Sequence, residues 1–282
     1  YQLLGGAFRT QIRLYANYWF TGGGHTAEDY AQQAKRVKDL GFTGLKFDPS
    51  AHTNYLYGED LNTDLGLTPT QKDVAFEVTK AVRDAVGSEF DMMIETHAML
   101  NFEVAVKMAE RLAPLGVTWY EEPAGPENAD TLRAFRERLP SNVPICVGER
   151  HYTRHGFRPV LEKHICDVIM PDITRCGGPS EMKRIATMGE AYGVMVAPHN
   201  PNGPLSTLAS AHVCASIPNF FRCEFMVNDV PWRDEVITYP LDVREGFLHL
   251  SDRPGLGVDL IEEELEKHPG IRGLKEKENF YV

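Results

Sequence analysis

Cysteine is scarce in this sequence and shows no pairing pattern. The five cysteines among 282 residues form no Cys-x-x-Cys pair, and their number is odd. These features argue against a disulfide framework and are typical of a reducing compartment, so we expect a cytoplasmic protein. The basic start and apolar run of a signal peptide are also missing near Tyr1. Because the first residue is not Met, we expect the chain to be part of a longer one.

Positive charge and long apolar runs are in short supply as well. Aspartate and glutamate number 40 against 29 lysines and arginines, which leaves a net charge of −11. A nucleic-acid backbone would repel such a surface, so we expect no nucleic-acid partner. The longest stretch without formal charge, 191–221, is broken by Pro198, Pro201 and Pro204, which no membrane-spanning helix would tolerate together. With 43% hydrophobic and 24% charged residues, the composition is typical of a globular protein.

Eight short apolar or β-branched runs recur along the chain, separated by longer stretches of helical periodicity. The runs are predicted to be strands and cover 12–15, 44–47, 92–95, 117–121, 145–148, 168–171, 194–198 and 220–225. Helices are predicted over 27–40, 69–86, 102–115 and 181–192. Thr68 is placed to cap the second of these, and Pro69 occupies its first position.

The spacing of these elements predicts the fold class. The last six strands start 23 to 28 residues apart, and eight such βα units predict an α/β fold, a TIM-like (β/α)₈ barrel. An open doubly wound sheet is the alternative, but its usual Gly-rich dinucleotide turn is missing. We assign residues 1–230 to the catalytic barrel and residues 231–282 to a C-terminal extension packed on it. The polar stretch 49–67 is predicted to form an active-site flap.

Polar side chains stand at the C-terminal ends of nearly all predicted strands. Because these ends converge on one mouth in a (β/α)₈ barrel, the residues are expected to lie together. They are Lys46, Asp48, Glu95, His97, Glu121, Glu122, Glu149, Asp172, His199 and Glu224. Side chains alternate along a strand, so Glu122 should point away from its neighbour Glu121, into a salt bridge.

Three of these carboxylates end consecutive strands and predict a metal site. Neighbouring strands lie about 4.8 Å apart, so Glu95, Glu121 and Glu149 can close on one ion, without which they would repel one another. Ligation by oxygen alone favours Mg²⁺, or Mn²⁺, over zinc. Each glutamate taken singly would be read as an ordinary strand-end residue, but three in succession favour the metal site.

The predicted sixth and seventh strands end in Asp172 and His199. A carboxylate that holds an imidazole fixes its tautomer and raises its basicity, so the pair is predicted to be a general base. A histidine that caps the following helix is the alternative. His97 faces the same mouth and is the candidate acid, with a structural role as its alternative.

The remaining charged side chains at the mouth are predicted to handle the substrate. Lys46, Asp48 and Glu224 would bind or polarise it. For Lys46 and Glu224 a role in a buried ion pair is the alternative interpretation.

Seven short motifs are spread from the start of the chain to its seventh βα unit. They are LLGG at 3–6, GLKFDP at 44–49, IETHA at 94–98, WYEEP at 119–123, VGER at 147–150, MPDITRCGG at 170–178 and APHNPNGP at 197–204. In combination they resemble the enolase superfamily, in its mandelate racemase subgroup, and specifically its sugar-acid dehydratases. That family also has an N-terminal capping domain, which we expect to be absent from this chain because the chain starts where that domain should end.

The resemblance implies a Mg²⁺ ion on the three glutamates, the Asp172 and His199 pair as base, and His97 as the acid that expels a hydroxide as water. The implied activity is that of a gluconate or galactonate dehydratase, whose product is a 2-keto-3-deoxy sugar acid. A sugar-acid cycloisomerase or epimerase and a catalytically silent barrel subunit are the alternatives. A zinc hydrolase is disfavoured because no paired histidines follow the first strand. We expect the protein to be a homo-oligomer.

Two positions depart from the family pattern. The first metal position is commonly aspartate and is Glu95 here, which resembles a variant of archaeal-type gluconate dehydratases. The racemases carry Lys-x-Lys where this chain has Lys46, Phe47 and Asp48. The missing second lysine removes a base on the opposite face and weakens the racemase interpretation.

Overall fold

The computed structural model describes residues 1–21, 23–50, 67–125 and 128–269. The predicted flap over 49–67 therefore falls almost entirely outside the described residues. Among the helices of the described ranges, none is both long enough and apolar enough to cross a membrane.

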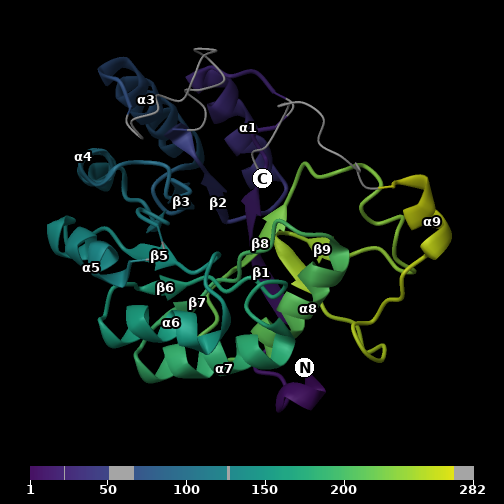
Figure 1. Cartoon of the computed structure of the whole chain (residues 1–282). Coiled ribbons are helices and arrows are strands. Elements are labelled where there is room, and N and C mark those ends of the chain that lie inside the picture. The colour runs from purple at the N-terminus through teal and green to yellow at the C-terminus, as the bar shows by residue number, and fades with distance from the viewer. Residues whose placement is uncertain (22, 51–66, 126–127, 270–282) are drawn as a thin grey trace.

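Parallel strands form the centre of the molecule (Figure 1). The strands β1 to β7 pair in chain order, and β8 pairs back with β1 in parallel. A parallel bridge between Val196 and Phe220 connects β7 to the segment just before β8. This closed pairing is consistent with the predicted barrel. The strands are β1 (Gln11–Asn17), β2 (Gly44–Phe47), β3 (Asp91–Glu95), β4 (Trp119–Glu121), β5 (Ile145–Val147), β6 (Val168–Ile169), β7 (Met195–Val196) and β8 (Cys223–Met226).

Helices alternate with the strands along the chain and surround them (Figure 1). The four predicted helices are present, with ends that differ by up to three residues; α5, α6 and α8 lie in stretches for which no helix bounds were predicted. The helices around the strands are α1 (Ala27–Asp39), α3 (Pro69–Val86), α4 (Phe102–Leu112), α5 (Ala129–Arg138), α6 (Thr153–Glu162), α7 (Gly178–Ala191) and α8 (Pro204–Ala215).

The helix ends follow local sequence signals. At the start of α3, the Thr68 side chain accepts a hydrogen bond from the Gln71 backbone, and the Gln71 side chain accepts one from the Thr68 backbone, which confirms the predicted cap. The helix predicted over 102–115 stops as an α-helix at Leu112 and ends in a 3-10 turn, η2 (Ala113–Leu115). Pro114 has no backbone donor for an α-helical bond, and Gly116 terminates the turn in the left-handed region at φ 67°.

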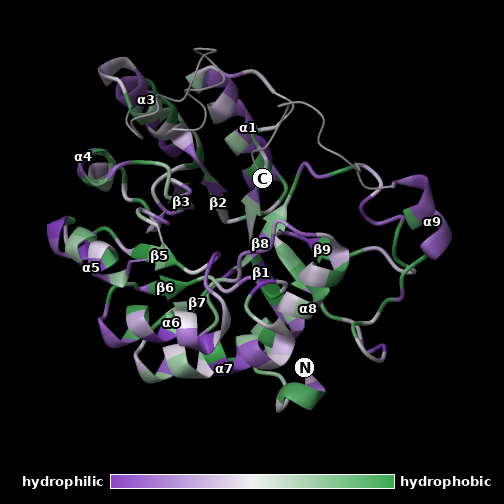
Figure 2. Ribbon diagram, in the orientation of Figure 1, coloured by the Kyte–Doolittle hydropathy of each residue, from purple (hydrophilic) through white to green (hydrophobic). Residues whose placement is uncertain are grey.

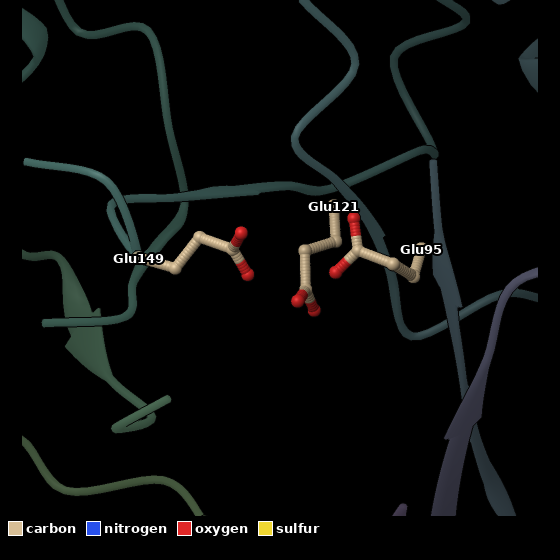
Figure 3. Close-up of side chains that lie close together, drawn as sticks. All are labelled: Glu95, Glu121 and Glu149. Carbon is tan, nitrogen blue, oxygen red and sulfur yellow. The ribbon is translucent and has the colours of Figure 1, made fainter. Parts of the chain in front are cut away.

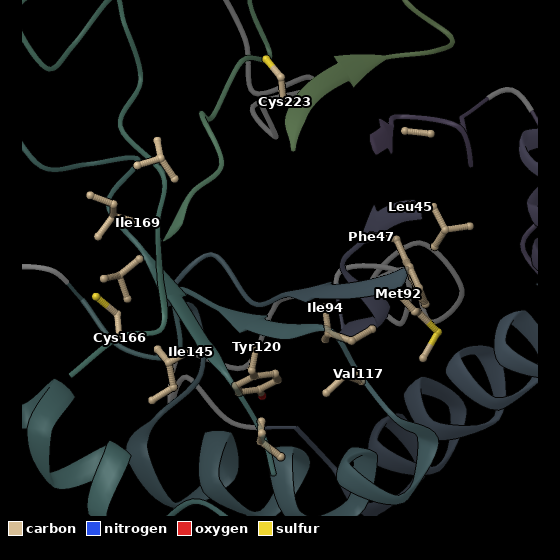
Figure 4. Close-up of a cluster of buried hydrophobic side chains, with 14 of the residues drawn as sticks. Leu45, Phe47, Met92, Ile94, Val117, Tyr120, Ile145, Cys166, Ile169 and Cys223 are labelled. Atoms are coloured by element: carbon tan, nitrogen blue, oxygen red, sulfur yellow. The ribbon is translucent and has the colours of Figure 1, made fainter. Parts of the chain in front are cut away.

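Strand side chains alternate between the helices and the barrel interior. The residues that face the helices form the main apolar core, and part of it is drawn in Figure 4, where Leu45, Ile94, Tyr120 and Ile145 are labelled. A second, smaller buried cluster lines the inside of the strand ring below the mouth. It consists of Tyr15, Met93, Trp119, Cys146, Val168, Met170 and Ala197. The interior is thus a packed core, and the polar residues lie above it at the strand ends.

The chain after β8 returns to the other end of the barrel. The strands β9 (Val243–Arg244) and β10 (Phe247–His249) form a hairpin, and β10 pairs antiparallel with the first residues of β1. The short helix α9 (Glu262–Lys267) lies apart from the ring of helices (Figure 1) and is mainly hydrophilic (Figure 2). A short 3-10 turn, η1 (Gln2–Leu4), precedes β1. The domain boundary at residue 230 stays a prediction.

Candidate active site

The three predicted glutamates converge at the carboxyl ends of neighbouring strands. Glu95 ends β3, Glu121 ends β4, and Glu149 comes two residues after β5. All three are buried, and one carboxylate oxygen from each lies within 4.8 Å of the other two (Figure 3). The predicted clustering is confirmed. A set of three carboxylates with no sulfur or nitrogen donor fits a hard divalent cation.

Each glutamate is held by a different kind of donor. The backbone N–H groups of Thr96 and His97 donate to Glu95 Oε1 at 2.9 and 2.5 Å. The indole N–H of Trp119 donates to Glu121 Oε2 at 2.7 Å. Glu149 Oε1 lies 3.4 Å from the guanidinium Nε of Arg150. These contacts fix the carboxylates in orientations from which their oxygens can meet one ion.

Lys46 is the cation buried among these carboxylates. Its ammonium group forms an ion pair with Glu121, lies 2.9 Å from Glu224 Oε1 and lies 3.5 Å from Glu95 Oε2. Burial would lower the pKa of Lys46, but the charges of Glu121 and Glu224 outweigh it and raise the pKa well above its usual value. The side chain is 3% exposed. The structure thus contains the buried ion pair named as the alternative, and contact of Lys46 or Glu224 with substrate stays a prediction.

One lysine does not balance the surrounding negative charge. Burial raises the pKa of Glu121 well above its usual value, and the charge of Glu95 raises it further. For Glu95 itself, burial is outweighed by His97, by a hydrogen bond with Glu121 and by Lys46, so its pKa falls below the usual value. Ionisation of one carboxylate therefore opposes ionisation of the next, and a bound divalent cation would relieve this conflict.

The predicted pair of Asp172 and His199 is present, just after β6 and β7. His199 Nδ1 lies 2.9 Å from Asp172 Oδ2, and His199 Nε2 lies 3.2 Å from Glu149 Oε2. Burial opposes ionisation of Asp172, but hydrogen bonds from His199 and Thr174 lower its pKa to about 2. The residue before α8 is Gly203, so His199 does not cap this helix. The imidazole thus has one nitrogen on an ionised carboxylate and the other directed to the glutamate cluster.

His97 belongs to a second carboxylate and imidazole pair that sequence reasoning missed. His97 Nδ1 lies 2.8 Å from Asp48 Oδ2, and Asp48 Oδ1 accepts hydrogen bonds from the backbone and hydroxyl of Ser50. Burial would lower the pKa of His97, but Glu95 and Asp48 raise it to about 9. The side chain is 43% exposed, so it is open to the mouth. Asp48 was predicted to bind substrate, and that role stays a prediction beside its contact with His97.

Glu122 is not a member of the cluster of Glu95, Glu121 and Glu149, but the salt bridge expected for it is wrong. No salt bridge is found for it in the described part of the chain, and its buried carboxylate accepts a hydrogen bond from the backbone of Gly148 at 2.7 Å. Strand alternation does not apply here, because β4 ends at Glu121 and Glu122 has a left-handed φ of 41°. Burial and the charge of Glu149 raise the pKa of Glu122 to about 8.

Several supporting residues at the mouth were not predicted. Trp119 stands two residues before Glu121 on the same strand, so alternation of side chains would have placed both on one face. Asn202 donates to Asp172 Oδ2 at 3.1 Å, and Asn17 donates to Glu224 Oε1 at 2.7 Å. No local pattern marks these two asparagines, because their partners come from distant segments.

Comparison with known proteins places the chain in a family. Residues 29–264 match the family described as enolase C-terminal domain-like. A mandelate racemase/muconate lactonizing enzyme-like protein from Rubrobacter xylanophilus has a solved structure that superposes with a TM-score of 0.85 at 36% identity, over 96% of this chain and 71% of that one. The chain belongs to the enolase C-terminal domain-like family.

Two of the relatives with curated names are sugar-acid dehydratases. The D-xylonate dehydratase of Haloferax volcanii is 32% identical over 95% of this chain and 64% of its own length. The D-gluconate dehydratase of Thermoproteus tenax is also 32% identical, over 95% of this chain and 52% of its own length. The chain therefore spans between half and two thirds of these two relatives.

Proposed function

We propose that this chain is the catalytic (β/α)₈ barrel of a Mg²⁺-dependent hydro-lyase that dehydrates a sugar acid, an aldonate such as gluconate or galactonate. The observation that carries this proposal is the cluster of Glu95, Glu121 and Glu149 next to two imidazoles, each held by an aspartate. The names of the two relatives agree with this class of small-molecule substrate. The homo-oligomeric state stays a prediction.

The difficulty of such a reaction is the removal of a proton next to a carboxylate. A divalent cation held by the three glutamates would stabilise the negative charge that develops on the substrate carboxylate; Mg²⁺ with a histidine base is a known combination for enolase-superfamily sites. His199 takes the C2 proton at Nε2, because Asp172 occupies Nδ1 and stabilises the imidazolium that forms.

Departure of the hydroxyl group needs an acid on the same substrate. His97, held by Asp48, donates a proton to the C3 hydroxyl, which leaves as water. The electron pair of the broken C2–H bond first moves toward the substrate carboxylate and then forms the C2–C3 double bond when the C3–O bond breaks. The enol that results tautomerises to a 2-keto-3-deoxy acid.

The test is to incubate the full natural protein with Mg²⁺ and a panel of aldonic and aldaric acids in D₂O and to follow products by mass spectrometry and NMR. Loss of water with formation of a 2-keto-3-deoxy acid is the expected result. Deuterium at C2 without loss of water would favour an epimerase, and conversion of a sugar-acid lactone added to the panel into an open-chain isomer would favour a cycloisomerase. No change with any substrate would favour a silent subunit.

One variant distinguishes the proposed roles of His199 and His97. His97→Asn should retain exchange of the C2 proton for deuterium and lose dehydration, because His199 still removes the proton while the leaving group has no acid. Loss of both exchange and dehydration would contradict the assignment of His97 as the leaving-group acid.

A further inference from the structure

Glu122 connects the carboxyl ends of β3, β4 and β5, where the three metal-ligand candidates lie. Its backbone N–H donates to the carbonyl of Cys146 in β5 at 3.0 Å, and its carbonyl accepts from the Thr96 hydroxyl at 2.9 Å and from Ala98 N at 2.8 Å, both after β3. Its side-chain Oε1 accepts from Gly148 N at 2.7 Å. One residue therefore has contacts at the ends of β3 and β5 while it directly follows β4.

The side-chain contact acts on the residue next to Glu149. Gly148 has a left-handed φ of 132°, and a Cβ atom there would lie 2.5 Å from the Phe157 ring. The backbone at this turn is thus confined by packing against Phe157 and by the hydrogen bond to the Glu122 carboxylate. Since Glu149 comes next in the chain, the direction of its side chain depends on how this turn is held.

The burial of Glu122 supports a positional role. Its side chain is buried, and its Oε2 atom has no hydrogen-bond partner in the described part of the chain. An apolar residue of the same size would avoid the cost of burying this oxygen, but it could not accept the Gly148 N–H.

We propose that Glu122 is a positioning residue of the metal site, whose carboxylate holds the Gly148 turn so that Glu149 meets the cation together with Glu95 and Glu121. This inference rests on the metal site of the proposed function and not on its reaction. Residues that orient metal ligands typically change metal affinity by about 10–100-fold when they are replaced.

The test uses variants that change the acceptor oxygen and its reach. Glu122→Gln keeps an acceptor oxygen at the same reach, Glu122→Asp keeps the carboxyl group but shortens the reach, and Glu122→Met keeps the size but has no oxygen. Titration of each with MnCl₂ alone, followed by calorimetry and by the EPR signal of free Mn²⁺, needs no substrate. We expect Glu122→Gln to bind nearly as the wild type does, and the other two to bind about 10–100-fold more weakly.

A matched control comes from α7. The Glu181 carboxylate also accepts a backbone hydrogen bond, from Arg154 N at 3.0 Å, but it is not part of the glutamate cluster. Glu181→Met should lower stability in a thermal melt and leave Mn²⁺ affinity unchanged. Wild-type affinity in Glu122→Asp or Glu122→Met, or a loss in Glu122→Gln equal to that in Glu122→Met, would overturn the proposal. The expected affinities without any sugar-acid turnover would instead count against the proposed reaction alone.

Discussion

Buried charges are balanced at one end of the strand ring and unbalanced at the other. At the amino end, the fully buried Arg222 forms an ion pair with Asp91 and donates to Thr43 Oγ1 and to the carbonyls of Leu14 and Thr43. At the carboxyl end, Lys46 contacts three carboxylates. The amino end pairs a cation with an anion and neutral acceptors, whereas the carboxyl end concentrates like charges. The amino end is thus arranged for stability, whereas the carboxyl end fits the proposed cation.

The largest effect should come from the pair of Asp172 and His199 at the carboxyl end. Asparagine cannot take the C2 proton, so His199→Asn should lower dehydration of the substrate found for the wild type by about a thousandfold. Mn²⁺ binding should change little, because the three glutamates are intact. Turnover is measured by NMR and binding by titration. Wild-type turnover would remove the histidine from the mechanism.

At the amino end, the expected change is in stability. Arg222→Met leaves Asp91 without its ion-pair partner and should lower the free energy of unfolding by about 3 kcal/mol. Arg133→Met is the control, because this side chain is 58% exposed and pairs with Glu137, which is also exposed, so it should cost less than about 0.5 kcal/mol. Urea unfolding measures both. If Arg222→Met kept its stability but lost Mn²⁺ affinity, the contrast between the two ends would fail.

Removal of the metal tests the repulsion at the carboxyl end. Mn²⁺ at a hundred times its dissociation constant should stabilise the wild type by about 2.7 kcal/mol relative to the protein in EDTA. Glu149→Gln should lose most of this stabilisation, yet in EDTA it should be at least as stable as the wild type, because one of the clustered charges is gone. Thermal melts with and without Mn²⁺ measure the difference. Equal stabilisation of both proteins by Mn²⁺ would exclude Glu149 as a ligand.

The smallest effect concerns a carboxylate outside both ends. The backbone hydrogen bond from Arg154 is the main reason why the pKa of Glu181 is lowered from its usual value. This hydrogen bond therefore stabilises the fold at pH values above the pKa of Glu181 in the unfolded chain, near 4.5. The stabilisation is lost as the pH falls through the lower pKa of Glu181 in the folded protein. The stability difference between the wild type and Glu181→Gln should be constant from neutral pH to mildly acidic pH and shrink below it. A difference that grows in acid would contradict the sign.

Sequence reasoning reached the parts of the site that follow from strand regularity. Glu95, Glu121 and Glu149 could be placed together because parallel strands in sequence order end at one edge. The pair of Asp172 and His199 followed from the same rule applied to the next two strands. Trp119 was within reach of this reasoning, since it shares a face with Glu121.

Two of the contacts that sequence reasoning missed depend on backbone turns beyond the strand ends. His97 and Glu122 follow their strands with left-handed φ values of 49° and 41°, so strand alternation does not determine which groups their side chains contact. In the structure the His97 ring contacts Asp48, and the Glu122 carboxylate accepts a hydrogen bond from Gly148 N in place of the expected salt bridge. Lys46 could not be assigned from the sequence for a different reason. Whether its ammonium group contacts substrate or forms an ion pair depends on which charged side chains surround it in space.

The sequence by itself determined the order of the βα units, the strand positions of the polar residues and the oxygen-only donor set. These properties follow from hydrophobic periodicity and residue type, which are local. The tertiary structure alone decided how the other charges are shared: Lys46 among three glutamates, Asp48 on the His97 imidazole, and Glu122 on the turn before Glu149. Electrostatic and hydrogen-bond energies depend on distances between atoms far apart in the chain, and only the folded backbone sets those distances.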